Sequence, residues 1–287
     1  MIELFDEPMS KHTTFRTGGN ARRFLIPESI NELKEAVRKC CEDKEEYLII
    51  GNGSNLLVSE KGYSGTVIQI SDKIGKITVS GEEIYAEAGA MLSAVARTAR
   101  DNGLSGFEFA SGIPGSVGGA AFMNAGAYGG EIKNVVTRVD VIVDGKLKSL
   151  SPEEMHFDYR HSIVMEKNMI ITGMAVKLEK KNPEEITAAM TELNRRRVEK
   201  QPLEYPSAGS TFKRPTGYFA GKLIEDSGLA GYRVGGAMVS TKHCGFVINY
   251  DNANSDDIYR LITDVKRIVM EKFGVELEPE VRLIGEF

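Results

Sequence analysis

The sequence predicts an α+β protein built from more than one domain. Its 287 residues exceed the usual size of a single domain. Hydrophobic residues make up 41% and charged residues 27% of the chain, which suffices for a buried core in a water-soluble protein. Helical and strand patterns follow one another along the chain, and no internal repeat is visible.

The first third of the chain alternates between helix and strand signals. Asn31 is a candidate N-cap for a helix whose apolar positions run to Cys40. Helical spacing returns at 91–102, and Gly103 is expected to end that helix. Short apolar runs split by glycine or polar residues predict strands at 47–50, 56–58, 66–70, 74–79 and 84–88.

The remaining elements are marked by turn and capping residues. Strands are expected at 135–143, 146–150 and 169–178, the first two joined by an Asp-Gly turn at 144–145. Proline at 183 favours the start of a helix that runs to about residue 200. Another helix is expected from the cap Ser255 to Gly274. Its apolar stripe indicates core packing, so we assign it no chemistry.

Composition excludes several classes of function. The formal net charge of -5 does not support a nucleic-acid-binding surface. The first ten residues do not resemble a signal peptide, and the longest apolar runs are far too short to span a membrane. Three cysteines and four histidines lack the spacing of a zinc site or a disulfide framework. We therefore expect a cytoplasmic protein without a metal.

The segment from Gly51 to Asn55 follows a predicted strand, as a phosphate-binding loop does. It lacks the Gly-Lys-Ser/Thr ending of a P-loop, and it is followed by a strand signal where a dinucleotide-binding motif needs a helix. Glycines can still turn several backbone N–H groups toward one anion. The segment by itself predicts a simple turn as readily as a phosphate site.

A second glycine cluster runs from Gly112 to Ala120 and is small, apolar and nearly uncharged. A helix can start at Ser116 within it. Small side chains let a flat aromatic group or a pyrophosphate approach the backbone, whereas tight packing of a helix on a sheet would use glycine equally well. Two glycine loops beside strands suggest one long ligand held at two places.

Several polar residues are candidates for chemistry. Arg160 lies between apolar stretches and suits a carboxylate, although a structural ion pair would look the same. Ser210 follows a glycine outside any hydrolase motif, so an ordinary surface serine is the alternative. Glu280 and Arg282 share one face of a strand, where a solvated ion pair is the alternative.

These segments, in their order, resemble the UDP-N-acetylenolpyruvoylglucosamine reductase family. Besides the two glycine loops, the resemblance rests on the segments 12–19, 124–129, 159–162, 207–213 and 280–282. It therefore covers nearly the whole chain. The family makes UDP-N-acetylmuramate for peptidoglycan and hence serves cell-wall biogenesis, cell shape and cell division. Its FAD domain resembles that of vanillyl-alcohol oxidase and p-cresol methylhydroxylase.

The resemblance implies the cofactors and site residues. FAD is bound noncovalently and NADPH is the co-substrate. The implied catalytic residues are Arg160, Ser210 as proton donor and Glu280, while Lys213 and Arg282 are expected to bind the substrate. The cofactor-binding residues that it implies are Gly51, Asn52, Gly53, Ser54, Asn55, Gly112, Ile113, Pro114, Gly115, Ser116, Gly118, Gly119 and Ala120.

The chain departs from the family pattern at two positions and is short. Arg214 stands where many members have Asn, and Asn52 stands where Gly is frequent. The length matches the subgroup that lacks an added loop over the substrate site. We expect two FAD-binding subdomains at 1–66 and 67–200 and a substrate domain at 201–277. The C-terminal strand 278–287 can return to the first subdomain.

The implied reaction is the NADPH-dependent reduction of the enolpyruvyl group of UDP-N-acetylglucosamine enolpyruvate. Its partners are these two small molecules, with no nucleic acid, membrane or obligate protein partner. Two alternatives remain at this stage. One is another FAD-dependent alcohol or sugar oxidoreductase on the same fold, which would not need Ser210 and Glu280. The other is a nucleotide-binding module without catalysis.

Overall fold

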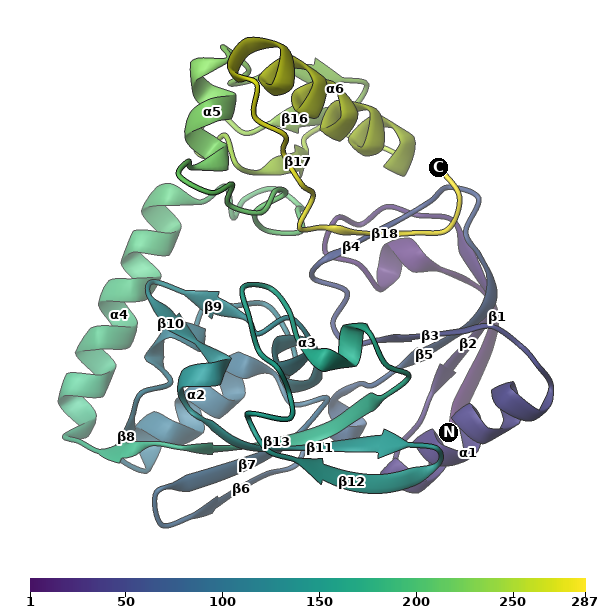
Figure 1. Ribbon diagram of the computed structural model, residues 1–287, viewed down its shortest axis with the longest axis vertical. Helices are drawn as coiled ribbons and strands as arrows, with labels where there is room; N and C mark the ends of the chain where they lie inside the picture. The colour runs from purple at the N-terminus through teal and green to yellow at the C-terminus, as the bar shows by residue number, and fades with distance from the viewer. The chain divides into compact units, whose positions relative to one another are not determined.

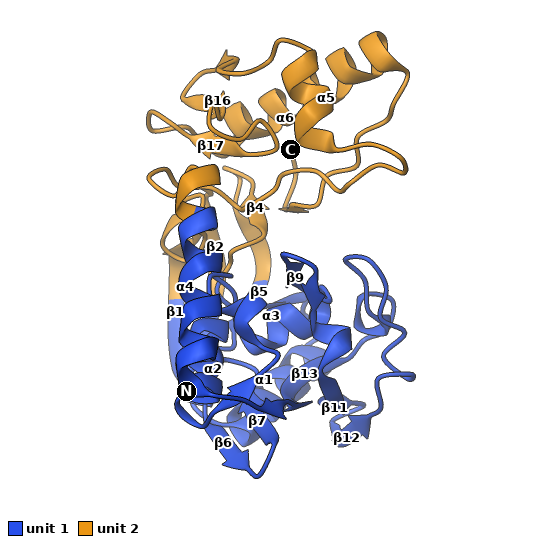
Figure 2. Cartoon of the chain, turned by 90° about the vertical axis from the view of Figure 1, so that its left-hand side faces the viewer, with its two compact units in different colours: residues 1–4, 24–52, 66–197 blue, residues 5–23, 53–65, 198–287 orange.

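The computed structural model describes residues 1–287, and the chain divides into two compact units (Figure 2). Unit 1 comprises residues 1–4, 24–52 and 66–197, and unit 2 comprises residues 5–23, 53–65 and 198–287. Three of the five unit boundaries fall within strands, namely β1 (Ile2–Pro8), β2 (Asn20–Ile26) and β5 (Tyr63–Gln69), and the other two follow Asn52 and Arg197. The expected division into three domains stays a prediction.

Strand β3 (Tyr47–Ile50) pairs with β5 in parallel, in a four-stranded sheet of order β1-β2-β5-β3. Helix α1 (Ile30–Glu42) connects β2 to β3 and buries one apolar face, which includes Leu33. Its N-cap is Ser29, whose hydroxyl accepts a hydrogen bond from the Glu32 N–H at 3.2 Å. The prediction of Asn31 as the cap was wrong, because that residue already lies inside the first turn.

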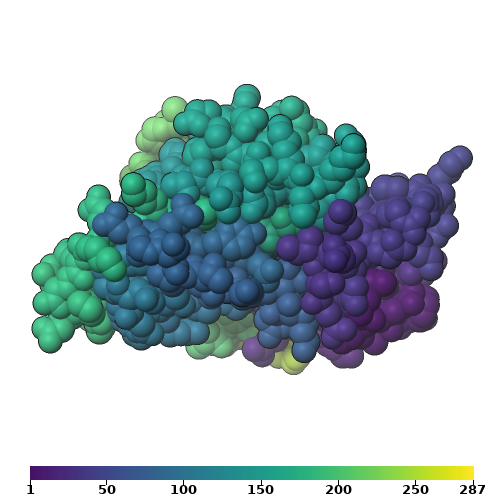
Figure 3. Space-filling view, turned by 90° about the horizontal axis from the view of Figure 1, so that it is seen from below, coloured from purple at the N-terminus to yellow at the C-terminus, as the bar shows by residue number.

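Unit 1 contains a five-stranded antiparallel sheet of order β12-β11-β13-β7-β6 (Figure 1). Its strands are β6 (Ile77–Ser80), β7 (Glu83–Glu87), β11 (Val136–Val143), β12 (Lys146–Leu150) and β13 (Ile170–Lys177). The predicted turn between β11 and β12 is confirmed, with φ of 48° at Asp144 and 71° at Gly145. Seen from below, the blue segment around residues 70–100 and the teal segment around 130–165 lie side by side (Figure 3).

Helices α2 (Leu92–Asp101) and α3 (Val117–Phe122) pack against β7 of this sheet, and α3 also packs against β13. Buried residues of these two helices and of the sheet form part of the core of unit 1, which also includes residues of α1. Two short antiparallel pairs complete the regular structure, β8 (Leu104–Ser105) with β14 (Glu179–Lys180) and β9 (Gly126–Ala127) with β10 (Gly130–Glu131). Helix α4 (Pro183–Lys200), of which residues 183–197 belong to unit 1, begins at proline as predicted.

Unit 2 is built on the antiparallel sheet of β15 (Arg233–Val234), β16 (Ala237–Val239) and β17 (Val247–Asn249). Helix α6 (Ser255–Phe273) packs on this sheet and on α5 (Ala220–Asp226). Strand β18 (Arg282–Ile284) pairs in parallel with β4 (Leu56–Val58). None of the helices combines the length and apolarity that a membrane span requires.

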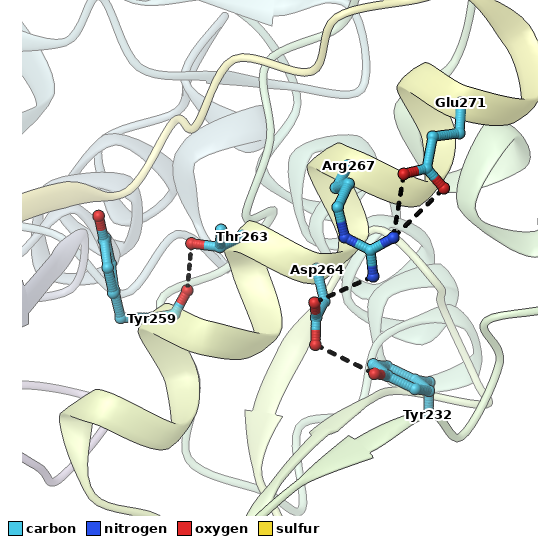
Figure 4. Close-up of polar contacts among 6 residues, drawn as sticks. All are labelled: Tyr232, Tyr259, Thr263, Asp264, Arg267 and Glu271. Atoms are coloured by element: carbon cyan, nitrogen blue, oxygen red, sulfur yellow. Dashed lines mark hydrogen bonds and ion pairs between the residues drawn. The ribbon is translucent and has the colours of Figure 1, made fainter.

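Helix α6 has the apolar stripe that the sequence predicts, but its N-cap is Asn254 rather than Ser255. The Asn254 side chain accepts from the Asp257 N–H at 2.8 Å. Gly274 ends the helix in the left-handed conformation, as predicted. On the solvated face, Arg267 links Asp264 to Glu271 (Figure 4). Exposed ion pairs of this kind are screened by water, so this face contributes only modestly to the stability of the helix.

Candidate active site

The two glycine loops are adjacent within unit 1. The Asn52 amide donates to the Pro114 carbonyl, with 2.6 Å between Nδ2 and O. A Cβ at position 51 would collide with the Ser116 hydroxyl, so a larger residue there would force that side chain to move. Gln69 fixes the first loop further by donating to the Gly51 carbonyl at 3.1 Å. Residues 51–52 and 114–116 therefore lie directly against each other.

The second half of the first loop belongs to unit 2 and has different partners. Gly53 adopts a φ of 60°, and a Cβ there would run into the His12 carbonyl. The side-chain amide of Asn55 donates to the Glu280 carbonyl at 3.0 Å, and its backbone carbonyl accepts from the Arg282 N–H at 3.0 Å. Asn55 thus holds the backbone of the segment that carries Glu280.

The glycines of the second loop serve different purposes. Gly118 donates its N–H to the Ala88 carbonyl at 2.8 Å, and a Cβ there would lie 3.0 Å from that of Ala88. This is the tight helix-on-sheet packing that the sequence left as an alternative. Gly112 instead faces the side chains of Asn194 and Arg197. The loop therefore packs on the sheet at its end and meets one neutral and one charged side chain at its start.

Arg160 occupies a tight turn of unit 1 in which its own φ is 54°. Asp158 and His161 flank it and exchange two backbone hydrogen bonds at 3.1 and 3.2 Å. The guanidinium donates to the Gly126 carbonyl at 3.3 Å and lies over the Tyr159 ring, 5.1 Å from its centroid. A left-handed conformation is costly for arginine, and such strain is often found at functional sites.

Asn124, a residue that we did not predict to matter, holds this turn in place. Its side chain is fully buried, and its amide donates to the Asp158 carbonyl at 2.9 Å and to the Glu131 carboxylate at 3.0 Å. Its oxygen accepts from the Lys133 N–H at 2.9 Å. The signal in the sequence was its place in the segment 124–129, which carries part of the family resemblance but gives Asn124 no role. Its partners, which lie up to 34 residues away, could not be read from the sequence.

In unit 2, Thr211 connects the backbones next to Ser210 and Glu280. Ser210 is exposed and follows Gly209, whose φ is 76°. Thr211 is fully buried, and its carbonyl accepts from the Glu280 N–H at 2.8 Å. Its hydroxyl accepts from the Val247 N–H at 2.9 Å, and its own N–H donates to the Gly245 carbonyl at 2.8 Å. Thr211 thus bonds directly to the backbone of Glu280 through its carbonyl, and its N–H and hydroxyl anchor it to Gly245 and Val247.

His243 extends the hydrogen-bond network of Thr211 through Gly245. Its Nδ1 accepts from the Gly245 N–H at 3.0 Å, and the Gly245 carbonyl in turn accepts from Thr211. Burial lowers the pKa of the His243 imidazole, which favours the neutral ring that this acceptor role requires. We did not single out His243 in the sequence, because a lone histidine carries no local signal.

The two predicted substrate-binding residues also lie in unit 2. The Lys213 N–H donates to the Glu278 carbonyl at 2.8 Å, and the Lys213 ammonium pairs with the Glu278 carboxylate. An anionic ligand of Lys213 would therefore compete with Glu278. Arg282 begins β18, and its side chain is exposed. Of the predicted polar residues, unit 1 carries Arg160, and unit 2 carries Ser210, Lys213, Glu280 and Arg282.

The comparisons with known proteins first define the class. Residues 21–151 match the family model described as an FAD binding domain. Residues 201–284 match the model of the C-terminal domain of UDP-N-acetylenolpyruvoylglucosamine reductase. The chain is therefore an FAD-dependent oxidoreductase with an α+β fold.

The relatives then give the family. The chain is 53% identical over 282 residues to the UDP-N-acetylenolpyruvoylglucosamine reductase of Caldanaerobacter subterraneus subsp. tengcongensis, covering 98% of this chain and 93% of the relative. It is 53% identical over 286 residues to that of Lachnoclostridium phytofermentans, covering 98% and 92%. The crystal structure of the enzyme from Thermus caldophilus matches with a TM-score of 0.85 at 36% identity, covering 99% of this chain and 98% of that chain. This chain belongs to the UDP-N-acetylenolpyruvoylglucosamine reductase family.

The residues of the glycine loops fit an FAD. In unit 1, positions 51, 112 and 119 carry no side chain, and the Ser111 hydroxyl beside Gly112 is buried without a hydrogen-bond partner. A pyrophosphate can accept from hydroxyl and backbone N–H donors of this kind, and absent side chains allow a flat ring system to approach. The structure thus provides a surface of small residues with a hydroxyl donor beside it, which fits the cofactor of this family.

Proposed function

We propose that this chain reduces the enolpyruvyl group of UDP-N-acetylglucosamine enolpyruvate with NADPH to give UDP-N-acetylmuramate, a peptidoglycan precursor. The observation that carries the proposal is the hydrogen-bond framework of Thr211, which joins the segments of Ser210 and Glu280 in a chain of this family. An alcohol or sugar oxidoreductase of the same fold would not need Ser210 and Glu280, and a nucleotide-binding module without catalysis would need no proton donor.

The two glycine loops are the proposed FAD site. The residues that would hold the cofactor in unit 1 are Gly51, Asn52 and the loop from Gly112 to Ala120. Bound noncovalently, FAD supplies the hydride chemistry that links NADPH to the enolpyruvyl group. Cys40 and Cys244 are buried, and no group of three or more His, Cys, Asp or Glu side chains is placed to hold a metal ion.

Arg160 is proposed to hold the carboxylate of the enolpyruvyl group. Negative charge grows on that carboxylate and on C2 when the methylene carbon accepts hydride. A fixed guanidinium that can donate two parallel hydrogen bonds suits this charge, and preorganised electrostatics is often the largest catalytic contribution. The tight turn between Asp158 and His161 fixes the backbone of Arg160, so little reorganisation is needed when the charge develops.

Ser210 is proposed as the proton donor to C2. Its position after Gly209 exposes the hydroxyl, while Thr211 fixes the backbone on its other side. Glu280 in its protonated form would donate a hydrogen bond to the substrate carboxylate, whereas an ionised Glu280 would oppose the developing charge. The protonated form is therefore the one that assists the reaction.

We further propose that the enzyme acts in the cytoplasm, where NADPH and UDP-sugars are available. Its partners are these small molecules, and no protein partner is required. Lys213 and Arg282 are proposed to bind anionic groups of the UDP-sugar.

An anaerobic two-step experiment tests the proposed function. Purified holoenzyme is first reduced with NADPH until its yellow colour bleaches, and UDP-N-acetylglucosamine enolpyruvate is then added. We expect the flavin absorbance to return with formation of one equivalent of UDP-N-acetylmuramate. A flavin that bleaches with NADPH but is reoxidised only by other alcohol- or sugar-derived substrates would contradict the proposal. A protein without flavin would contradict it too.

A further inference from the structure

His243 lies in the loop that joins β16 to β17, and its backbone is fixed on both sides. The His243 N–H donates to the Ser240 hydroxyl at 3.3 Å, and the His243 carbonyl accepts from the Phe246 N–H at 2.9 Å. The Phe246 ring meets the imidazole edge-on, with 5.0 Å between the ring centroids and 66° between the planes. The loop therefore determines where the imidazole ring lies.

The imidazole has one defined tautomer in this place. A backbone N–H can only donate, so the 3.0 Å bond from the Gly245 N–H requires an unprotonated Nδ1, and the neutral ring carries its proton on Nε2. A Cβ on Gly245 would lie 2.9 Å from Cε1 of the ring, and a Cβ on Gly221 of α5 would lie 3.3 Å from the same atom. The absence of both side chains lets the ring lie close to these two backbones.

Two hydrogen bonds lead from this ring to the backbone of Ser210. Gly245 donates its N–H to His243, and its carbonyl accepts from the Thr211 N–H at 2.8 Å. The Thr211 N–H belongs to the same planar peptide unit as the Ser210 carbonyl. The bond to Gly245 therefore fixes the peptide plane that directly follows Ser210, and with it the direction of the exposed serine side chain.

Protonation of the ring would break the first of these bonds, because an imidazolium carries a proton on Nδ1 and cannot accept. Burial lowers the pKa of the His243 imidazole, and the positive charge of Lys200 at the end of α4 lowers it further. The other charged side chains on the neighbouring segments pair with one another or act on Cys244: Lys242 with Glu204, Lys222 with Asp226, Lys213 with Glu278, and Glu225 on Cys244.

A residue that only closed this turn would not need to be histidine. Asn and Asp side chains commonly accept from the backbone N–H two residues further along, which is the bond that His243 makes to Gly245. The imidazole differs from an asparagine amide because it gains a proton near neutral pH. Histidine therefore gives the backbone beside Ser210 a sensitivity to pH that asparagine would not.

We propose that His243 is a positioning residue for Ser210: its neutral ring holds the Ser210–Thr211 peptide unit through Gly245, and protonation of the ring releases that unit. This inference rests on the proposed function, in which Ser210 donates the proton to C2. Flavin reduction by NADPH needs no such donor. The effect of His243 therefore falls on the second half-reaction, in which the enolpyruvyl substrate reoxidises the flavin.

The test follows both half-reactions by stopped-flow absorbance from about pH 5 to pH 8. We expect wild-type reoxidation to slow as the pH falls below about 6.5, the ordinary pKa of histidine, beyond any change in flavin reduction. His243→Asn keeps an acceptor that cannot be protonated, so it should reoxidise at nearly the wild-type rate at pH 8 and lack this loss in acid. His243→Leu has no acceptor and should be slower by about tenfold at every pH.

His156→Asn, the same change at an exposed histidine, is the matched control and should follow the wild-type profile. Equal losses in acid for His243→Asn and the wild type, or wild-type reoxidation by His243→Leu, would overturn the inference. Should neither variant at 243 fold, ¹⁵N NMR of the wild-type holoenzyme decides. The Gly245 amide and the reoxidation rate should change with one apparent pKa, and an amide that does not respond to acid would overturn the inference.

The proposed function is judged separately from this pH profile. If the wild-type flavin is reoxidised by the enolpyruvyl substrate and only the expected difference between the 243 variants is missing, the inference alone fails. If the substrate does not reoxidise the wild-type flavin at any pH, the proposed function fails.

Discussion

The turn that carries Arg160 and the segment that carries Ser210 are held in different ways. In unit 1, one buried side chain, the amide of Asn124, makes three hydrogen bonds that tie together parts of three loops. In unit 2, the backbone of Thr211 bonds to two neighbouring segments, and its hydroxyl adds a third bond. Arg160 itself takes the strained conformation, whereas Gly209 takes it for Ser210.

The difference follows from the local structure that each residue has available. Arg160 lies in irregular loops, where no strand offers a regular row of donors and acceptors, so a side chain must satisfy the buried backbone groups. Ser210 lies next to extended segments, where hydrogen bonds between backbone groups satisfy the buried donors and acceptors. Glycine before Ser210 leaves its position free of strain, while the turn at Arg160 must be stabilised by its surroundings.

The largest effect is expected from Ser210→Ala, which tests whether the exposed serine is more than a loop residue. Removing a positioned general acid typically slows a reaction by about 10²–10⁴-fold. Stopped-flow absorbance should show flavin reduction by NADPH at nearly the wild-type rate and reoxidation by the enolpyruvyl substrate slowed by that factor. Ser210→Cys should recover part of the loss, because a thiol can also donate a proton. Two unchanged half-reactions would make Ser210 an ordinary loop serine.

Asn124→Ala should have the next largest effect, on stability as well as on rate. It removes three hydrogen bonds from a buried site, which at about 1 kcal/mol each costs about 3 kcal/mol. We expect a lower free energy of unfolding in urea and, in the folded fraction, slower reoxidation with normal flavin reduction. The exposed Asn134 is the control, and Asn134→Ala should change neither. If the free energy of unfolding of Asn124→Ala equalled that of the wild type, the loops would keep their conformation without these hydrogen bonds.

Thr211→Val should have a smaller effect, because the backbone pairing of residue 211 remains. The Val247 N–H loses its acceptor in a buried place, at a cost of about 1–3 kcal/mol. We expect reoxidation to slow by roughly tenfold while the KM for NADPH is unchanged, as for a residue that positions the proton donor. Thr211→Ser keeps the hydroxyl and should restore the rate. Equal losses in both variants would assign the effect to packing of the methyl group.

Local patterns predicted much of the secondary structure. Helix α4 begins at Pro183 and α6 ends at Gly274, because proline and glycine act on their own backbone. Local patterns did not identify the N-caps of α1 and α6. At each helix start, two residues with a side-chain oxygen lie within two positions of each other: Ser29 and Asn31 in α1, and Asn254 and Ser255 in α6. Which of them takes the extended conformation depends on how the chain enters the helix. The short strands β15 to β17 carry too few residues for a pattern to be seen.

The sequence by itself also determined the family, because the ordered motifs and the nearly full-length identity need no structure. Only the tertiary structure decided what those residues contact. The bond from Asn52 to Pro114 joins residues 62 positions apart, and that from Asn55 to Glu280 joins residues 225 apart. Arg197 looks like Arg195 and Arg196 in the sequence, and only the packing of α4 places it against Gly112. The reason is physical: hydrogen bonds and burial depend on distance in space, and a one-dimensional pattern records only distance along the chain.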